Sequence, residues 1–274
     1  MSVHEPLTAK PATSNATKCY IAGSLALIAG YVDVICFIRY STFVATMTGN
    51  LVMTGQTFFE VVHNVVGIKD LKKPTPGIVS QHLDIYEAVY MVTFRLAVMF
   101  FNCLGAFCHE FWQRRHPDAT ARTAAPYLAA LAVVPDLARR HGLNTATDKL
   151  HETWVQMWAV MPLAFSLGFT HFLCSPAATG SRLKNVVMAS TGHMHKVSKL
   201  LHRRACGDQL KPSEWEAMIL STTISVCMLV GAVLGGAALH LNPFGEDTDD
   251  GLLIPVGMVL LCSLWAHDKW IAPP

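Results

Sequence analysis

The chain has 274 residues, of which 52% are hydrophobic and only 15% are charged, and its mean hydropathy is +0.35. Soluble domains carry about a quarter charged residues, so this composition argues against a soluble enzyme. The net charge of +2 comes without a basic stripe interleaved with aromatic residues, and it gives no support for a nucleic-acid partner. The eight cysteines form no C-x-x-C pair, which favours buried thiols over a disulfide or zinc framework.

Eight apolar runs predict an all-α, polytopic membrane helix bundle of six to eight helices. They lie at about 19–38, 49–66, 86–108, 124–138, 154–173, 186–201, 216–240 and 252–267. A crossing needs about 20 apolar residues, so these runs leave no room for a separate soluble domain. Residues 1–18 are polar and are expected to form a disordered tail, whereas residues 19–270 are expected to form a single integral membrane domain.

Three of the eight runs are not straightforward crossings. The run at 124–138 is short and contains Pro126 and Pro135, so it would cross only with a tilt or a kink. The runs at 49–66 and 186–201 contain several polar residues. These two are either short spans or helices that dip into the membrane and line a cavity.

The distribution of Lys and Arg predicts the orientation. Whether or not the two polar runs cross, most basic residues fall on the side of the N-terminus, and the acidic loop 241–251 falls on the opposite side. The positive-inside rule then places both termini in the cytoplasm. A plasma or inner membrane is expected rather than an organelle.

The two halves of the chain resemble each other, in order. Residues 30–33 (GYVD) match residues 168–171 (GFTH), and residues 44–50 (VATMTGN) match residues 187–193 (VMASTGH). The order and spacing of these matches indicate an internal duplication, with half-repeats at about 19–138 and 154–267. The repeats would be parallel if the helices after the two Thr-Gly pairs cross the membrane, and inverted if those helices are re-entrant. Both arrangements occur in transporters.

Two ionisable residues, Asp33 and Arg95, lie inside apolar helices. Such a residue costs about 2.5 to 3.5 kcal/mol at a helix centre, so it usually pairs with an opposite charge or lines a wet cavity. One interpretation is an Asp33–Arg95 ion pair that locks two helices; the other places both on a solute pathway. His171 stands at the position that matches Asp33, so the two residues can also be read as a proton relay.

The tripeptide Thr48-Gly49-Asn50 has the residues of a helix start. Thr or Asn can cap a helix, Gly allows close approach, and the first amides of the helix are free to bind a polar group. This tripeptide is either the break in a discontinuous membrane helix or an ordinary cap at the membrane surface. Thr191-Gly192-His193 would be its partner in the second half.

Other patterns indicate architecture rather than chemistry. The single Glu60-x-x-His63 lacks the second motif that a di-iron site needs, so no metal or cofactor is expected. The chain contains no nucleophile elbow or zinc-protease motif, and it is not expected to be an enzyme. Gly231-x-x-x-Gly235 allows close helix packing and is a candidate contact in a homo-oligomer.

The motifs at residues 29–33 (AGYVD) and 43–50 (FVATMTGN) resemble the YoaK-like family of multi-pass membrane proteins, the domain of unknown function 1275. In that family a G-x-x-D ending of the first helix precedes an F-x-a-x-M-T-G-N motif. The resemblance extends over about residues 19–267 and departs from the family pattern at His171 and His193. It implies an integral membrane protein and supplies no activity.

Two functions are compatible with these features. The first is a small-solute transporter or permease of unknown substrate, with Asp33, Arg95 and the two Thr-Gly turns near the pathway. The expected partners are then the lipid bilayer and a small solute or ion. The alternative is a non-catalytic membrane scaffold or assembly factor, in which the same residues lock helices together.

Overall fold

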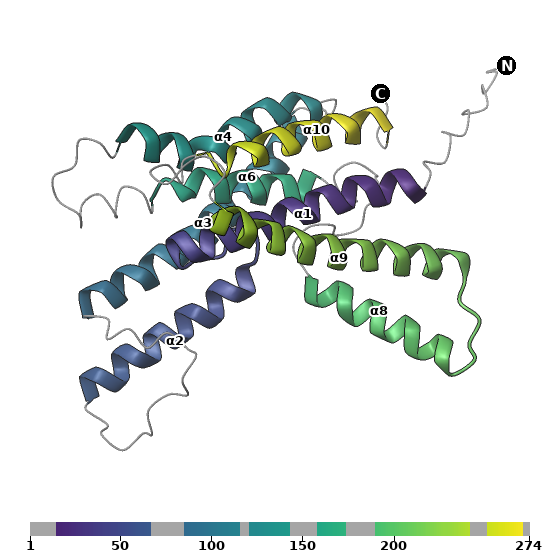
Figure 1. Cartoon of the computed structure of the whole chain (residues 1–274), viewed down its shortest axis with the longest axis horizontal. Helices are drawn as coiled ribbons and strands as arrows, with labels where there is room; N and C mark the ends of the chain where they lie inside the picture. The colour runs from purple at the N-terminus through teal and green to yellow at the C-terminus, as the bar shows by residue number, and fades with distance from the viewer. Residues whose placement is uncertain are drawn as a thin grey trace.

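The computed structural model describes residues 15–66, 85–115, 121–142, 158–173, 190–241 and 251–270. Within these ranges the chain is helical and contains no strand, which confirms the prediction of an all-α bundle (Figure 1). The described helices are α1 (Asn15–Tyr40), α2 (Met47–Val66), α3 (Ile85–Arg115), α4 (Ala121–Gly142), α6 (Val160–Leu173), α8 (Ser190–Ala205), α9 (Pro212–Leu241) and α10 (Ile254–Trp270).

Among the described helices, three are long and apolar enough to cross a membrane. They are the segments Ala16–Tyr40 of α1, Tyr86–Trp112 of α3 and Pro212–Leu241 of α9. Shorter apolar helices occupy Val160–Thr170 and Ile254–His267. The apolar run at 124–138 is part of α4, which continues as one helix through Pro126 and Pro135.

The first helix begins earlier than the composition suggests. Residues 15–18, which were expected to belong to the polar tail, form the first turn of α1, and residues 1–14 lie outside the described residues. Lys18 is buried and forms an ion pair with Glu216 of α9. This pairing allows a polar residue to extend the apolar helix by a turn.

Glycine residues bring helices together backbone to backbone at two crossings. Gly30 of α1 packs against α9, and Gly231 of α9 packs against α1. Each lies so close to the other helix that an added Cβ would overlap a carbonyl group. Gly105 of α3 and Gly168 of α6 do the same at the second crossing. The four contacts are Gly30 with Met228, Gly231 with Leu27, Gly168 with Asn102, and Gly105 with Phe165.

The Gly231–Gly235 pair therefore packs within the chain. Gly231 lies against Leu27 and Gly235 lies against Tyr31, both in α1. These two glycines were a candidate contact between two copies of the chain, but their small surface is already covered by α1.

The contacts also fix the relative directions of the helices. α1 and α9 are parallel, because Leu27 meets Gly231 and Tyr31 meets Gly235 one turn later. α3 and α6 are parallel for the same reason, with Gly105 against Phe165 and the ring of His109 5.1 Å from that of Phe169.

The last described helix, α10, packs on both α1 and α4. Tyr31 donates a hydrogen bond to the carbonyl of Leu252 (2.9 Å), and the hydroxyls of Ser24 and Ser263 lie 2.9 Å apart. α4 and α10 meet where the Arg122 guanidinium stacks 4.9 Å from the Trp265 ring. The paired helices α4 and α10 form the upper layer in Figure 1, above α1 and α6.

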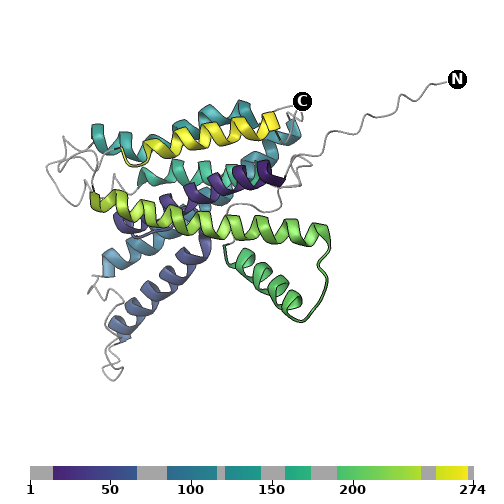
Figure 2. The same cartoon turned by 45° about the vertical axis from the view of Figure 1, so that its right-hand side comes forward.

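Two helices leave this packed centre as arms. α2 packs on the first half of α3, and α8 packs on the first half of α9 (Figure 1). Both views place the first turns of α2 and α8 near the middle of the molecule, from which the two helices diverge (Figures 1 and 2). The two Thr-Gly pairs lie in these first turns.

Candidate functional site

The segment 41–46, here called the connector, joins α1 to α2 and is not helical. It folds back along α1, because Val44 and Ala45 lie beside Asp33, two turns before the end of that helix. Thr42, Val44 and Ala45 are buried. Non-helical backbone at membrane depth must find its hydrogen bonds inside the protein or in a water-filled cavity, so the residues that supply those bonds define the site.

Asp33 accepts hydrogen bonds from the last residues of the connector. Its Oδ1 accepts from the amides of Val44 (2.9 Å) and Ala45 (2.7 Å), and its Oδ2 accepts from the Thr46 hydroxyl (2.9 Å). α2 begins at the next residue, Met47. A carboxylate therefore occupies the positive end of the helix, where free amides and the helix dipole favour an anion.

Asn50 holds the middle of the connector. Its Oδ1 accepts from the Thr42 hydroxyl (2.9 Å) and the Phe43 amide (2.8 Å), while its Nδ2 donates to the Phe43 carbonyl. Gly49 lies directly against the Phe43 ring, and a Cβ at this position would collide with it. Two residues of the Thr-Gly-Asn motif are thus required to fold the connector onto the start of α2.

Thr48, the first residue of that motif, has a different environment. Thr48 is exposed, and the carboxylate of Asp33 supplies the capping acceptor that Thr48 or Asn50 was expected to supply. The hypothesis of a simple surface cap is therefore not sufficient for this helix start.

Two polar residues of α3 hold the connector from the other side. Arg95 donates through Nε to the Ser41 carbonyl (3.1 Å) and through Nη1 to Met53 and Thr57 of α2. The Nη1 distances are 2.8 Å to the Met53 carbonyl and 2.7 Å to the Thr57 hydroxyl. Seven residues further along α3, Asn102 donates to the Val44 carbonyl (3.1 Å). α3 therefore runs antiparallel to α1 beside the connector.

The structure brings Asp33, Asn50 and Arg95 together, but in a different way from the expected ion pair. Asp33 takes its partners from residues 44–46, whereas Arg95 donates to Ser41, Met53 and Thr57. Within the described part of the chain no ion pair joins Asp33 to Arg95. The interaction that links α1 to α3 is the shared connector.

The matching motif in the second half is only partly visible. His193 is buried, and its Nδ1 lies 3.1 Å from the Ser221 hydroxyl of α9. Thr191 and Gly192 lie in the first turn of α8 and His171 lies in α6, but their side chains fall outside the described residues. His193 is on the arm formed by α8, opposite to the arm formed by α2 (Figure 1).

Sequence reasoning missed several members of this polar network. Asn102 and Thr57 are buried contacts of the connector and of Arg95, and neither was selected as a site residue. Asn102 interrupts the apolar stretch of α3 between Arg95 and His109, which was the available signal. Arg39 and Asp136 form a buried ion pair, with 3.2 Å between Nη1 and Oδ1.

The long apolar helices among the described residues indicate an integral membrane protein of the polytopic α-helical class. The chain matches the family model described as "Protein of unknown function (DUF1275)" over residues 21–265, and it belongs to that family. This confirms the resemblance noted in its motifs. No curated protein and no solved structure matches the chain.

Proposed function

We propose that this protein is a small-solute transporter or permease in which the connector and the start of α2 form a discontinuous membrane helix. The observation that carries the proposal is the buried connector, which is folded back to the level of Asp33 and held by polar residues of three helices. Transporters commonly place substrate sites at such breaks, near the middle of the membrane. The substrate is unknown, and the proposal includes no catalytic step and no cofactor.

The glycine contacts support an internal repeat. In α1, Gly30 and Leu27 correspond to Gly168 and Phe165 of α6, each 138 positions later. The residues of α9 that contact α1 lie 126 positions after the residues of α3 that contact α6. Those corresponding contact residues are Met228 with Asn102, and Gly231 with Gly105. Each contact in the α1–α9 crossing therefore has an equivalent contact in the α3–α6 crossing.

The helix directions favour an inverted repeat. α3 is antiparallel to α1 and parallel to α6, so α1 and its counterpart α6 run in opposite directions. Inverted repeats follow if α2 and α8 are re-entrant and the other six described helices cross. In that arrangement the first turns of α2 and α8 approach the membrane centre from opposite sides, as an alternating-access pathway requires.

The same arrangement fits the charge distribution. With α2 and α8 not crossing, most Lys and Arg residues remain on the side of the N-terminus. We therefore propose that both termini lie in the cytoplasm, in a plasma or inner membrane.

A second candidate function is a non-catalytic membrane scaffold or assembly factor. One observation favours it: Asp33 and Asn50 already form hydrogen bonds with the connector. In a scaffold these contacts would be permanent, whereas in a transporter the connector must exchange some of them for solute or water.

Water accessibility at the start of α2 separates the two functions without knowledge of the substrate. In a background with the native cysteines replaced, Thr48→Cys is reconstituted in oriented vesicles and treated with a membrane-impermeant maleimide from each side. Alternating access predicts labelling from both sides. Val230→Cys, on the exposed face of the apolar helix α9, is the control that should label from neither side.

Labelling of Thr48→Cys from one side only, or from neither side, would reject the transporter and favour the scaffold. Where labelling occurs from both sides, uptake of a panel of radiolabelled solutes into proteoliposomes would identify the substrate class.

A further inference from the structure

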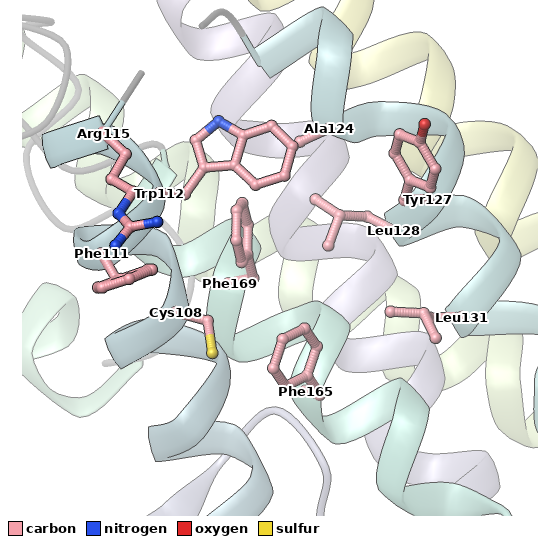
Figure 3. Close-up of a pocket in the computed structure, with 10 residues that line it drawn as sticks. All are labelled: Cys108, Phe111, Trp112, Arg115, Ala124, Tyr127, Leu128, Leu131, Phe165 and Phe169. Carbon is pink, nitrogen blue, oxygen red and sulfur yellow. The ribbon is translucent and has the colours of Figure 1, made fainter. Parts of the chain in front are cut away.

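An apolar pocket opens on the outside of the bundle between α3, α4 and α6. Its volume is about 370 Å³, at the lower end of the range of small-molecule sites. Figure 3 shows its aromatic and aliphatic lining, with Arg115 at one edge. The lining residues are Cys108, Phe111, Trp112, Arg115, Ala124, Tyr127, Leu128, Leu131, Phe165 and Phe169. This pocket is separate from the connector and goes beyond the transport proposal.

The depth of the pocket follows from α3. The apolar segment of that helix ends at Trp112, and Arg115 stands one turn further on. Tyr127 is 68% exposed and Phe111 is 52% exposed, so the pocket opens away from the bundle. Its apolar wall therefore faces hydrocarbon, while Arg115 reaches the level of the lipid headgroups, where long basic side chains extend out of the membrane.

Three basic side chains among the described residues lie at this end of the bundle. The Arg115 guanidinium lies 4.8 Å from the Phe111 ring centre, which holds it over the pocket. At the same end of the bundle, Arg122 and Lys269 both lie over the Trp265 ring, at 4.9 and 5.8 Å. An apolar hollow with a fixed cation at its rim is complementary to an acyl chain that carries an anionic headgroup.

We propose that this pocket binds an anionic phospholipid, with part of one acyl chain between Phe165 and Leu128 and the phosphate at Arg115. Basic pockets between membrane helices are known to select such lipids. The α3 side of this site is not repeated in α9. The positions of α9 that correspond to Phe111, Trp112 and Arg115, 126 residues later, are Ala237, Ala238 and Leu241.

The test compares two neighbouring arginines of α3. Arg114 and Arg115 are both exposed, and only Arg115 lines the pocket. Binding of phosphatidylglycerol and phosphatidylcholine with identical acyl chains is measured on the purified full chain by native mass spectrometry. The wild type should prefer phosphatidylglycerol. Arg115→Gln should reduce that affinity roughly fivefold, as expected for one basic side chain near a lipid phosphate, whereas Arg114→Gln should retain it.

A second variant tests the acyl-chain part of the pocket. Leu131→Trp fills the hollow from the less buried edge of α4 and should weaken binding of both lipids. The proposal is overturned if the wild type binds both lipids equally, or if the two arginine variants lose the same affinity. Displacement of the lipid by inorganic phosphate at the same concentration would also overturn it, because the site would then recognise the free anion.

Discussion

Asp33 and Arg95, which have opposite charges and are buried in α1 and α3, hold the same six-residue connector from its two ends without forming an ion pair with each other. Asp33 accepts from the end that enters α2, and Arg95 donates to the carbonyl of Ser41 at the other end. The Asp33 carboxylate accepts from backbone amides and a hydroxyl, and Arg95 donates to two backbone carbonyls and a hydroxyl. A substitution at either residue should therefore alter how the connector is held.

Substitution of Asp33 tests the first of these contacts. Asp33→Ala leaves the buried amides of Val44 and Ala45 without their acceptor, at about 1–3 kcal/mol for each group. We expect the free energy of unfolding to fall by about 3 kcal/mol or more. Asp33→Asn retains one acceptor oxygen and should cost less. Thermal unfolding of the purified protein in detergent measures both effects.

The two Asp33 variants also separate transport from architecture. In proteoliposomes, Asp33→Asn should abolish solute uptake while the protein still folds and inserts. Equal losses of folded protein and of uptake would instead assign Asp33 a purely structural role. Thr48→Ala, at an exposed position of the same helix start, is the control and should change stability by less than about 0.5 kcal/mol.

Arg95 is expected to be irreplaceable by lysine. Its Nε and Nη1 donate in different directions, to Ser41 and to Met53, and a single ammonium group cannot reproduce that fork. Arg95→Lys should lower stability by about 1–3 kcal/mol. Arg114→Lys, at an exposed position near the end of the same helix, should have no measurable effect. Similar unfolding midpoints for the two variants would contradict the observed contacts.

The glycine crossings predict that alanine substitutions at two positions of α9, five residues apart, differ in their effect on stability. Gly231→Ala would push a Cβ into the Leu27 carbonyl and should cost about 1–3 kcal/mol, which corresponds to a midpoint lowered by about 2–4 °C for each kcal/mol. Gly236→Ala meets nothing within 4 Å and should be neutral or stabilising. A destabilising Gly236→Ala would show that this face of α9 is covered.

The Arg39–Asp136 pair should behave as a coupled unit. Both side chains are buried, and Asp136 also accepts a hydrogen bond from the Leu253 amide (2.6 Å). Removing one partner of a buried ion pair costs about 3–5 kcal/mol, because the other charge is left uncompensated. In a double-mutant cycle, Arg39→Met with Asp136→Leu should be less destabilised than the sum of the two single variants. Additive effects would exclude the coupling.

The sequence predicts the helices better than it predicts their partners. The apolar runs locate every described helix, with ends that differ by up to seven residues. The cost of burying Asp33 and Arg95 identifies them as residues that need partners. Their partners are groups of the connector and of α2, whose positions depend on how α1, α2 and α3 pack together. No periodicity along one helix carries that information. Asn102 shows the same limit, since its role depends on contact with Val44, 58 positions away.

The pairing of α1 with α9 has a consequence for how the protein is made. The helix α1 meets its backbone-to-backbone partner only when α9 has been synthesised, nearly two hundred residues later. Until then Gly30 lacks the Met228 carbonyl against which it packs. The crossing of α1 and α9 therefore forms late in synthesis, and a truncated N-terminal half would lack it.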